Sequence, residues 1–157
     1  MPKRENILSL DETFMALAKV IAKRSPDPNT QVGACIVSSD NKVVSLGYNK
    51  FPNNCDDEFP WNRDEEDPLQ NKHLYVVHSE LNAILDAQGK NLKGCKIYVT
   101  LFPCNECTKA IIQAGISEVI YLSDKDHHKN FSIASRRMLN AANIKIRQFE
   151  PKYSIIL

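Results

Sequence analysis

Apolar residues recur along the chain first at helical spacing and then in short runs that are typical of strands. Ser9 and Glu12 form the pattern of a capping box, and the apolar residues after them share one helical face. Prolines follow Arg24, so the pattern predicts a first helix that ends near Arg24. Two runs with β-branched residues, 32–37 and 42–48, lie on either side of a turn and predict an antiparallel hairpin.

The second half of the chain alternates helical and strand-like segments. Helices are predicted over residues 79–88, 104–114 and 133–142, and strands over residues 96–100, 119–122 and 144–149. After the opening hairpin, this order predicts an α/β fold with a five-stranded mixed sheet, largely parallel, in a three-layer α/β/α arrangement. The length of 157 residues predicts a single domain, with residues 1–8 as a flexible N-terminal segment.

A polar segment with several prolines separates the hairpin from the next predicted helix. It runs from about residue 50 to residue 73, and a loop longer than about 12–15 residues is usually functional or disordered. Its acidic run, residues 64–67, is most simply a solvated surface. Trp61 and Arg63 have two open interpretations: they stack on a base or an effector, or Trp61 anchors the loop to the core.

Composition and charge are those of an ordinary soluble globular protein. Hydrophobic residues make up 43% and charged residues 25%, and the net charge of +1 argues against a broad nucleic-acid-binding surface. No apolar stretch approaches the roughly 20 residues of a membrane span, and no secretory pattern follows the first residues. The five cysteines show no disulfide pattern, so we expect a cytoplasmic or nuclear protein with reduced thiols.

Two short motifs, His78-x-Glu80 and Cys104-x-x-Cys107, carry the candidate chemistry. One imidazole and two thiolates can hold Zn²⁺ and leave one coordination position open, as catalytic zinc sites do. Both motifs lie at the starts of predicted helices, where the positive end of the helix dipole favours the thiolate form that a metal needs. The sequence therefore predicts one catalytic Zn²⁺ held by His78, Cys104 and Cys107, with Glu80 beside it.

Other interpretations of these residues stay open at this point. A Cys-x-x-Cys pair alone can be a redox pair, and a structural zinc site needs a fourth ligand, for which Cys95 and Cys55 are the candidates. His127 and His128 are most simply solvated, because adjacent side chains do not converge on one ion. Glu80 favours catalysis, since it can carry protons for a zinc-activated water. The His-x-Glu motif together with Pro-Cys-x-x-Cys is the signature of zinc-dependent deaminases.

Longer motifs around these residues carry a resemblance to a known family. They are residues 27–37 (DPNTQVGACIV), 47–49 (GYN), 78–84 (HSELNAI), 101–107 (LFPCNEC) and 111–116 (IIQAGI). On these motifs the chain resembles the cytidine and deoxycytidylate zinc-dependent deaminases, and most closely those that act on deoxycytidylate (dCMP). The resemblance implies a cytidine-deaminase-like fold and hydrolysis of dCMP to dUMP and ammonia, which supplies thymidylate synthesis. It also implies a homohexamer that dCTP activates and dTTP inhibits.

The resemblance also implies roles for residues outside the zinc motifs. Asn49 matches an asparagine that meets the sugar in related deaminases, and Asn29 is a second sugar or phosphate candidate; turn roles remain open for both. A phosphate needs cations or N–H groups, for which Arg24 and Ser25 are candidates. The polar loop resembles the effector-binding segment of the family. Its candidate effector residues are Asn49, Lys50, Asn54, Trp61 and Arg63.

Three residues depart from the family pattern. Ser79 replaces the commoner alanine of the His-x-Glu motif; it is small and able to cap the helix, so we expect no harm from it. Lys50 and Asn54 stand where the family usually has glycines, which tolerate positive φ, so they put effector control rather than catalysis in question. A second zinc would use a cysteine of this loop, but Cys55 has only His73 as an obvious partner, so we expect one Zn²⁺ per chain.

Three other functions fit parts of the pattern. They are deamination of a base in RNA or of a free nucleoside, zinc binding in a non-catalytic subunit, and deamination of dCTP. An RNA-editing enzyme is expected to have a basic surface, which a net charge of +1 supports poorly. A subunit that only assembles needs no proton carrier such as Glu80.

Overall fold

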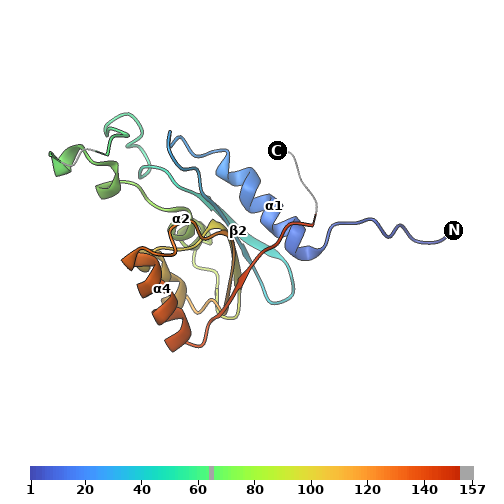
Figure 1. Cartoon of the computed structure of the whole chain (residues 1–157). Helices are drawn as coiled ribbons and strands as arrows, with labels where there is room; N and C mark the ends of the chain where they lie inside the picture. Colours follow the sequence, from blue (N-terminus) through green and yellow to red (C-terminus); the bar gives the residue numbers. More distant parts are fainter. Residues whose placement is uncertain (64–65, 153–157) are drawn as a thin grey trace.

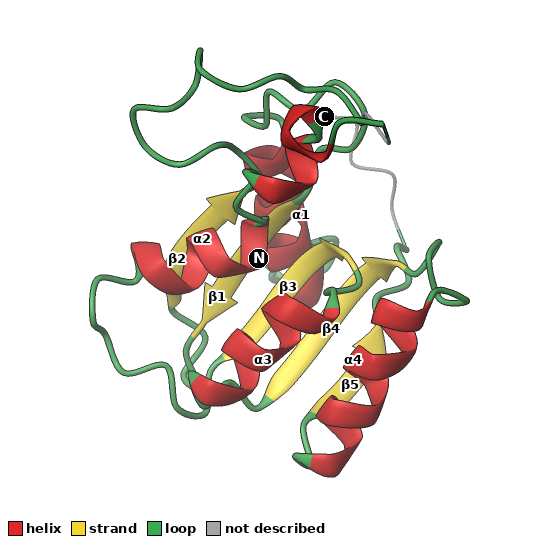
Figure 2. Ribbon diagram, turned by 90° about the vertical axis from the view of Figure 1, so that its left-hand side faces the viewer, coloured by secondary structure: helices red, strands yellow, loops and turns green. Residues whose placement is uncertain are grey.

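The computed structural model describes residues 1–63 and 66–152. The chain order of the regular elements is α1 (Leu10–Ala22), β1 (Gly33–Val37), β2 (Val43–Tyr48), the 3₁₀ turns η1 (Pro68–Gln70) and η2 (Lys72–Leu74), α2 (Ser79–Asp86), β3 (Lys96–Leu101), α3 (Asn105–Gln113), β4 (Glu118–Ser123), α4 (Asn130–Ala141) and β5 (Lys145–Gln148). The five strands form one sheet in the order β2-β1-β3-β4-β5. Helix α1 covers one face of the sheet, and α2, α3 and α4 lie on the other face (Figures 1 and 2). The predicted three-layer α/β/α fold is confirmed.

The sheet is less parallel than the sequence predicted. Strand β1 pairs antiparallel with both β2 and β3, whereas β3, β4 and β5 run parallel to one another. Because β1 opposes β3, the amino end of β1 lies at the same edge as the carboxyl ends of β2, β3 and β4. Strand polarity is set by pairing between segments about 60 residues apart, which local periodicity does not report.

Helix ends differ from the predictions where the capping signals are weak. Helix α1 has the predicted capping box, in which Ser9 accepts from the Glu12 N–H and Glu12 accepts from the Ser9 N–H. Helix α4 begins at Asn130, three residues before the predicted start, and its N-cap residue Lys129 makes no side-chain cap. Its start therefore had no sequence signal. Helix α2 ends at Asp86, two residues earlier than predicted.

The hydrophobic core forms two layers, one on each face of the sheet. On the α1 side, Phe14 and Met15 pack against Tyr98 and Ile120 of the sheet. On the other side the larger cluster is built from strand residues and from the inward faces of α2, α3 and α4. Its fully buried members include Ile36, Ala83, Ile97, Val99, Ile111, Val119 and Leu139. Residues 1–9 have no regular secondary structure and extend from the start of α1 (Figure 1).

Gly47 sets how closely α2 approaches the sheet. A Cβ atom at Gly47 would lie 2.2 Å from the Ser79 carbonyl oxygen and 2.4 Å from the Ala83 nitrogen, both in the backbone of α2. We expect Gly47→Ala to lower the free energy of unfolding by about 1–3 kcal/mol or more, because overpacking forces backbone to move. Urea unfolding measures this, with Val43→Ala at the exposed start of the same strand as the control. Equal stabilities would contradict the close approach.

The segment between β2 and α2 projects from the body of the molecule (Figure 1); we call residues 50–77 the excursion. Its base is closed by a two-way backbone bridge between Lys50 and Val77, at 3.1 and 2.8 Å. Within it, Trp61 stacks on the fully buried Phe51 with 4.1 Å between ring centroids, and Phe59 stacks on Tyr75 at the same distance. The structure therefore shows Trp61 as an anchor of the excursion. The acidic run 64–67 lies partly outside the described residues.

Among the described residues, no helix combines the length and the apolar character that a membrane crossing requires.

Candidate active site

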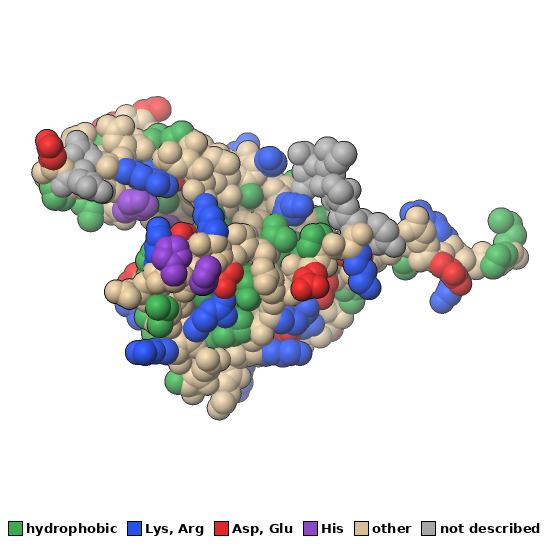
Figure 3. All heavy atoms as spheres, viewed as in Figure 1, with side chains coloured by type: hydrophobic (Ala, Val, Ile, Leu, Met, Phe, Trp, Pro, Cys, Tyr) green, Lys and Arg blue, Asp and Glu red, His purple; other side chains and the backbone are tan. Residues whose placement is uncertain are grey.

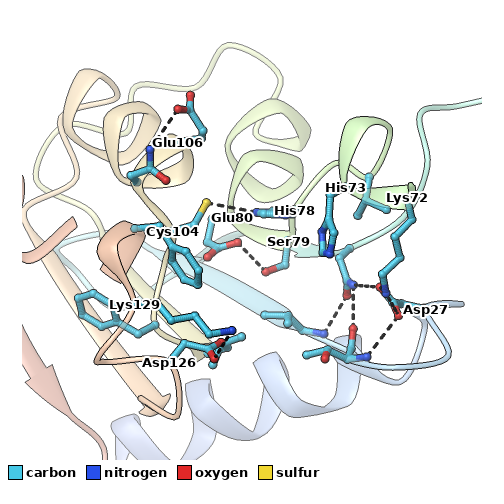
Figure 4. Close-up of a pocket in the computed structure, with 18 of the residues that line it drawn as sticks. Asp27, Lys72, His73, His78, Ser79, Glu80, Cys104, Glu106, Asp126 and Lys129 are labelled. Atoms are coloured by element: carbon cyan, nitrogen blue, oxygen red, sulfur yellow. Dashed lines mark hydrogen bonds and ion pairs between the residues drawn. The ribbon is translucent and has the colours of Figure 1, made fainter. Parts of the chain in front are cut away.

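A cavity of about 500 Å³ opens at the sheet edge where β1 begins and where β2 and β3 end. This volume is within the usual range for a small-molecule site. It is lined by residues from the approach to β1, the end of β2, the excursion, the starts of α2 and α3, and the β4–α4 connection. They include Asp27, Thr30, Val32, Asn49, Arg63, Lys72, His73, His78, Ser79, Glu80, Phe102, Cys104, Glu106, Lys125, Asp126 and Lys129 (Figure 4).

Three metal-ligand candidates converge at this cavity. His78 Nδ1 lies 3.4 Å from Cys104 Sγ and 3.6 Å from Cys107 Sγ, and the three ligand atoms lie within 4.8 Å of one another. Zinc bond lengths to sulfur and nitrogen and a tetrahedral angle predict an S···N separation of about 3.5 Å. The predicted set of His78, Cys104 and Cys107 therefore fits a zinc ion held by three protein ligands.

The start of α2 was predicted correctly and that of α3 to within one residue, and these two helix starts explain the convergence. His78 is the N-cap residue of α2, and Cys104 is the N-cap residue of α3. The Cys104 sulfur accepts from the backbone N–H of Cys107 at 3.5 Å, a donor that the helix leaves unpaired. The i,i+3 spacing then places the Cys107 sulfur on the same side of the helix start.

The protonation of the three ligands is coupled. Hydrogen bonding from Cys107 lowers the pKa of the Cys104 thiol to about 4, and the same contact, with burial, raises the pKa of Cys107. The hydrogen bond to Cys104 raises the pKa of His78 to about 9. At pH 7 without metal, Cys104 is therefore a thiolate, while His78 and Cys107 hold their protons.

Zinc binding is therefore expected to release protons. A coordinating histidine is neutral and a coordinating cysteine is a thiolate, so at pH 7 His78 and Cys107 each lose a proton and about two are released per zinc ion. The released protons are measured with a pH indicator while zinc is added to metal-free protein in weak buffer. Release close to zero would contradict this protonation pattern.

Glu80 lies beside the ligand set and is almost completely buried, with 4% of its surface exposed. Burial raises the pKa of its carboxyl group, and the nearby charge of His78 opposes that effect. Ser79 is the first residue of α2, so it does not cap the helix as expected. Its hydroxyl instead donates to Glu80 Oε2 at 3.0 Å and helps to orient the carboxylate (Figure 4).

Only some of the substrate-site candidates line the cavity. Asn49 lines the cavity and is buried, with its Oδ1 accepting from the Val32 N–H at 2.8 Å and its Nδ2 donating to the Thr30 carbonyl at 2.9 Å. Its amide therefore ties the end of β2 to the start of β1, and any contact of Asn49 with a sugar remains a prediction. Arg24 and Ser25 do not line the cavity, and the Ser25 hydroxyl donates to the Asn49 carbonyl at 2.8 Å.

Two lysines of the cavity, Lys125 and Lys129, had no sequence signal, whereas Arg63 was a predicted effector candidate. Lys125 and Lys129 follow β4, and Lys129 is paired with Asp126 at 3.3 Å. Arg63, from the excursion, also lines the cavity. In Figure 3, Lys, Arg and His side chains gather where the excursion meets the body. Burial and nearby cations lower the pKa of His73, so this histidine is neutral at pH 7.

The other candidate metal ligands do not join the cluster. Across residues 1–63 and 66–152, His78, Cys104 and Cys107 are the one group of three or more suitable side chains. Cys95 is buried at the amino end of β3, the opposite end of the strand from the cavity, so it is no fourth ligand. His127 and His128 are exposed and pack edge to face with 5.5 Å between ring centroids.

The backbone accommodates Lys50 and Asn54, which stand where the family usually has glycines. Asn54 has a φ of 68°, which asparagine adopts more readily than most residues. Lys50 is not among the described residues with positive φ, and its backbone forms the bridge to Val77. Neither substitution therefore strains the excursion.

Fold and site together define a class: an α/β protein with a three-ligand metal site and a buried carboxylate beside it, as in zinc-dependent deaminases. The model of the cytidine and deoxycytidylate deaminase zinc-binding region matches residues 8–123. The chain belongs to this family of hydrolytic deaminases, as its motifs predicted.

Individual relatives cover nearly the whole chain. Human deoxycytidylate deaminase is 53% identical over 156 residues, which cover 99% of this chain and 88% of the relative. The probable deoxycytidylate deaminase of Drosophila melanogaster is 52% identical over 160 residues, which cover 98% and 79%. The structure of dCMP deaminase from the cyanophage S-TIM5 in complex with dCMP and dUMP has a TM-score of 0.69 at 21% identity, covering 95% of this chain and 100% of that chain. This last likeness shows a shared fold.

Proposed function

We propose that this protein hydrolyses dCMP to dUMP and ammonia. The observation that carries the proposal is the buried carboxylate of Glu80 beside a ligand set whose separations fit zinc, at the end of a cavity large enough for a nucleotide. Relatives with that named activity match this chain at 52–53% identity over nearly its full length. The ligand set separates this protein from a redox protein, because all three donor atoms face one point.

In the proposed mechanism His78, Cys104 and Cys107 hold Zn²⁺. When bound, zinc lowers the pKa of a coordinated water from about 15.7 to about 7, which supplies hydroxide at neutral pH. Glu80 takes the proton from the water and delivers it to the ring nitrogen next to the amine-bearing carbon. After the hydroxide oxygen has bonded to that carbon, Glu80 takes the remaining hydroxyl proton and passes it to the departing amine. The C–N bond then breaks, the carbon–oxygen double bond forms and ammonia leaves. Ser79 keeps the Glu80 carboxylate in place for both transfers.

The cations around the cavity support a nucleotide rather than a free nucleoside. Lys125, Lys129 and Arg63 line the cavity, and cations of this kind recognise phosphate groups. Arg24 does not line it, so the phosphate contact is better assigned to these three residues. A preference for dCMP over deoxycytidine follows.

Regulation by dCTP and dTTP is proposed for the excursion. Arg63 of the excursion lines the cavity, close in sequence to the anchoring Trp61. The backbone bridge between Lys50 and Val77 lies one residue before His78. An effector held by the excursion can therefore bias the start of α2. Activation by dCTP and inhibition by dTTP would fit an enzyme that supplies thymidylate synthesis.

Assembly into a homo-oligomer, a hexamer by resemblance, is proposed from exposed leucines. Leu69 and Leu74 on the excursion and Leu85 on α2 are 66%, 61% and 64% exposed. Apolar side chains mark a protein contact when they form one contiguous patch, so we propose that these three leucines meet in one interface. Light scattering of the purified protein measures the mass, and a monomer at micromolar concentration would contradict assembly.

One assay tests the proposed activity against its alternatives. Zinc-loaded protein is incubated with dCMP, deoxycytidine, cytidine, dCTP or tRNA, with and without dCTP and dTTP as effectors, and ammonia release is followed. We expect the highest kcat/KM for dCMP. Absence of release from dCMP under every condition would refute the proposal, and release from tRNA or dCTP alone would identify one of the alternatives.

A further inference from the structure

Lys72 is a buried cation in the cavity wall that no motif predicted. Its side chain is 2% exposed, although lysine is almost never fully buried unless it is paired. Its Nζ lies 2.6 Å from each carboxylate oxygen of Asp27 and 3.0 Å from Asn29 Oδ1. Three acceptors therefore use all three donors of the ammonium group. The charge of Lys72 is satisfied within the protein and is not available to a ligand.

Asp27 connects Lys72 with the cavity wall through hydrogen bonds. Its Oδ1 accepts from the backbone N–H of Asn29 at 2.8 Å and of Thr30 at 3.2 Å. The Thr30 carbonyl in turn accepts from Asn49, whose Oδ1 accepts from the Val32 N–H. One hydrogen-bonded network thus connects Lys72 with the start of β1 and the end of β2. Figure 4 shows it on the side of the cavity away from Cys104.

Stability alone does not explain a buried ion pair at this place. Apolar residues of similar volume often stabilise a protein as well as or better than a buried salt bridge, because two charges must lose their hydration. Burial by itself would raise the pKa of Asp27, yet the hydrogen bonds from Lys72 and the backbone outweigh it and hold that pKa below its ordinary value. Asp27 is therefore a carboxylate, and its contact with Lys72 adds a fixed geometry.

Lys72 also ties the excursion to this wall. Its backbone N–H donates to the Asn62 carbonyl at 2.8 Å, and its Nζ lies 5.8 Å from the centroid of the Trp61 ring. These contacts connect the aromatic anchor of the excursion with the ammonium group that holds Asp27.

We propose that Lys72 is a positioning residue for the deamination reaction: through Asp27 it sets the wall formed by Thr30, Val32 and Asn49, against which the nucleotide binds. This inference rests on the proposed dCMP activity. Lys72 touches no reacting atom in this scheme. Its removal is expected to weaken binding of the substrate in the ground state and the transition state alike, which raises KM and leaves kcat nearly unchanged.

The first test compares wild-type and Lys72→Met protein, both loaded with zinc and checked for folding by circular dichroism. We expect KM for dCMP to rise about tenfold or more and kcat to change by less than about threefold, the pattern of lost uniform binding. We also expect inhibition by deoxycytidine, which has no phosphate, to weaken by a similar factor. Lys145→Met, which changes an exposed lysine of β5, is the control and is expected to match wild type.

A second variant keeps the test decisive if Lys72→Met does not fold. The double variant Asp27→Asn/Lys72→Met leaves no unpaired buried charge, and we expect it to fold with the same rise in KM. A KM within twofold of wild type in either folded, zinc-loaded variant would overturn the proposal. A loss of dCMP affinity without weaker deoxycytidine inhibition would overturn it too, since Lys72 would then be a phosphate ligand. Wild-type protein that does not deaminate dCMP would refute the proposed function instead.

Discussion

Glu80→Gln is expected to keep its zinc and to lose turnover by about 10²–10⁴-fold, the usual contribution of a general acid–base group. Glutamine has nearly the same shape and fits the same buried place, and it can still accept from the Ser79 hydroxyl. It cannot take a proton from water or return one to the departing amine. Ammonia release from dCMP measures turnover, and metal analysis measures zinc in the same samples.

The control for this change is Asp86→Asn, which neutralises an exposed carboxylate at the far end of the same helix. We expect wild-type turnover from it, because surface substitutions away from a site have small effects. A Glu80→Gln protein with turnover within tenfold of wild type would remove Glu80 from the proposed role. Loss of zinc from that variant would instead show that the carboxylate helps to build the metal site.

Cys107→Ala is expected to lose both zinc and activity. It removes one of three protein ligands, and the remaining His78 and Cys104 leave an incomplete site. The loss of zinc affinity should exceed the roughly 10–100-fold that follows removal of a group that only orients a ligand. Competition with a coloured chelator measures the affinity, and ammonia release measures activity at saturating zinc.

Cys95→Ala is the matched control, because Cys95 is also a buried cysteine and was one of the two candidate fourth ligands of a structural site. We expect it to bind zinc as wild type does, since Cys95 lies at the opposite end of β3 from the cavity. Zinc loss in Cys95→Ala, or full zinc affinity in Cys107→Ala, would disprove the three-ligand assignment.

The proximity of His78, Cys104 and Cys107 could be predicted from the sequence because much of its geometry is local. The capping position of Cys104 and the i,i+3 spacing to Cys107 bring two sulfurs together within one helical turn. His78 comes from another helix, and the sequence had also predicted that it lies at a helix start. The pair of Lys72 and Asp27 was missed because its members are 45 residues apart and lie in irregular segments.

Periodicity and caps in the sequence by itself determined nearly every helix and strand, and the spacing of His78, Glu80, Cys104 and Cys107 determined the residues of the proposed zinc site. These features depend on interactions within one or two helical turns. Only the tertiary structure decided the antiparallel β1–β3 pairing, the path of the excursion and the Lys72–Asp27 anchor of the cavity wall. Each of these features joins residues that are far apart in the chain. Burial and pairing offset the entropy cost of closing the loop between them, and no local sequence pattern reports those contacts.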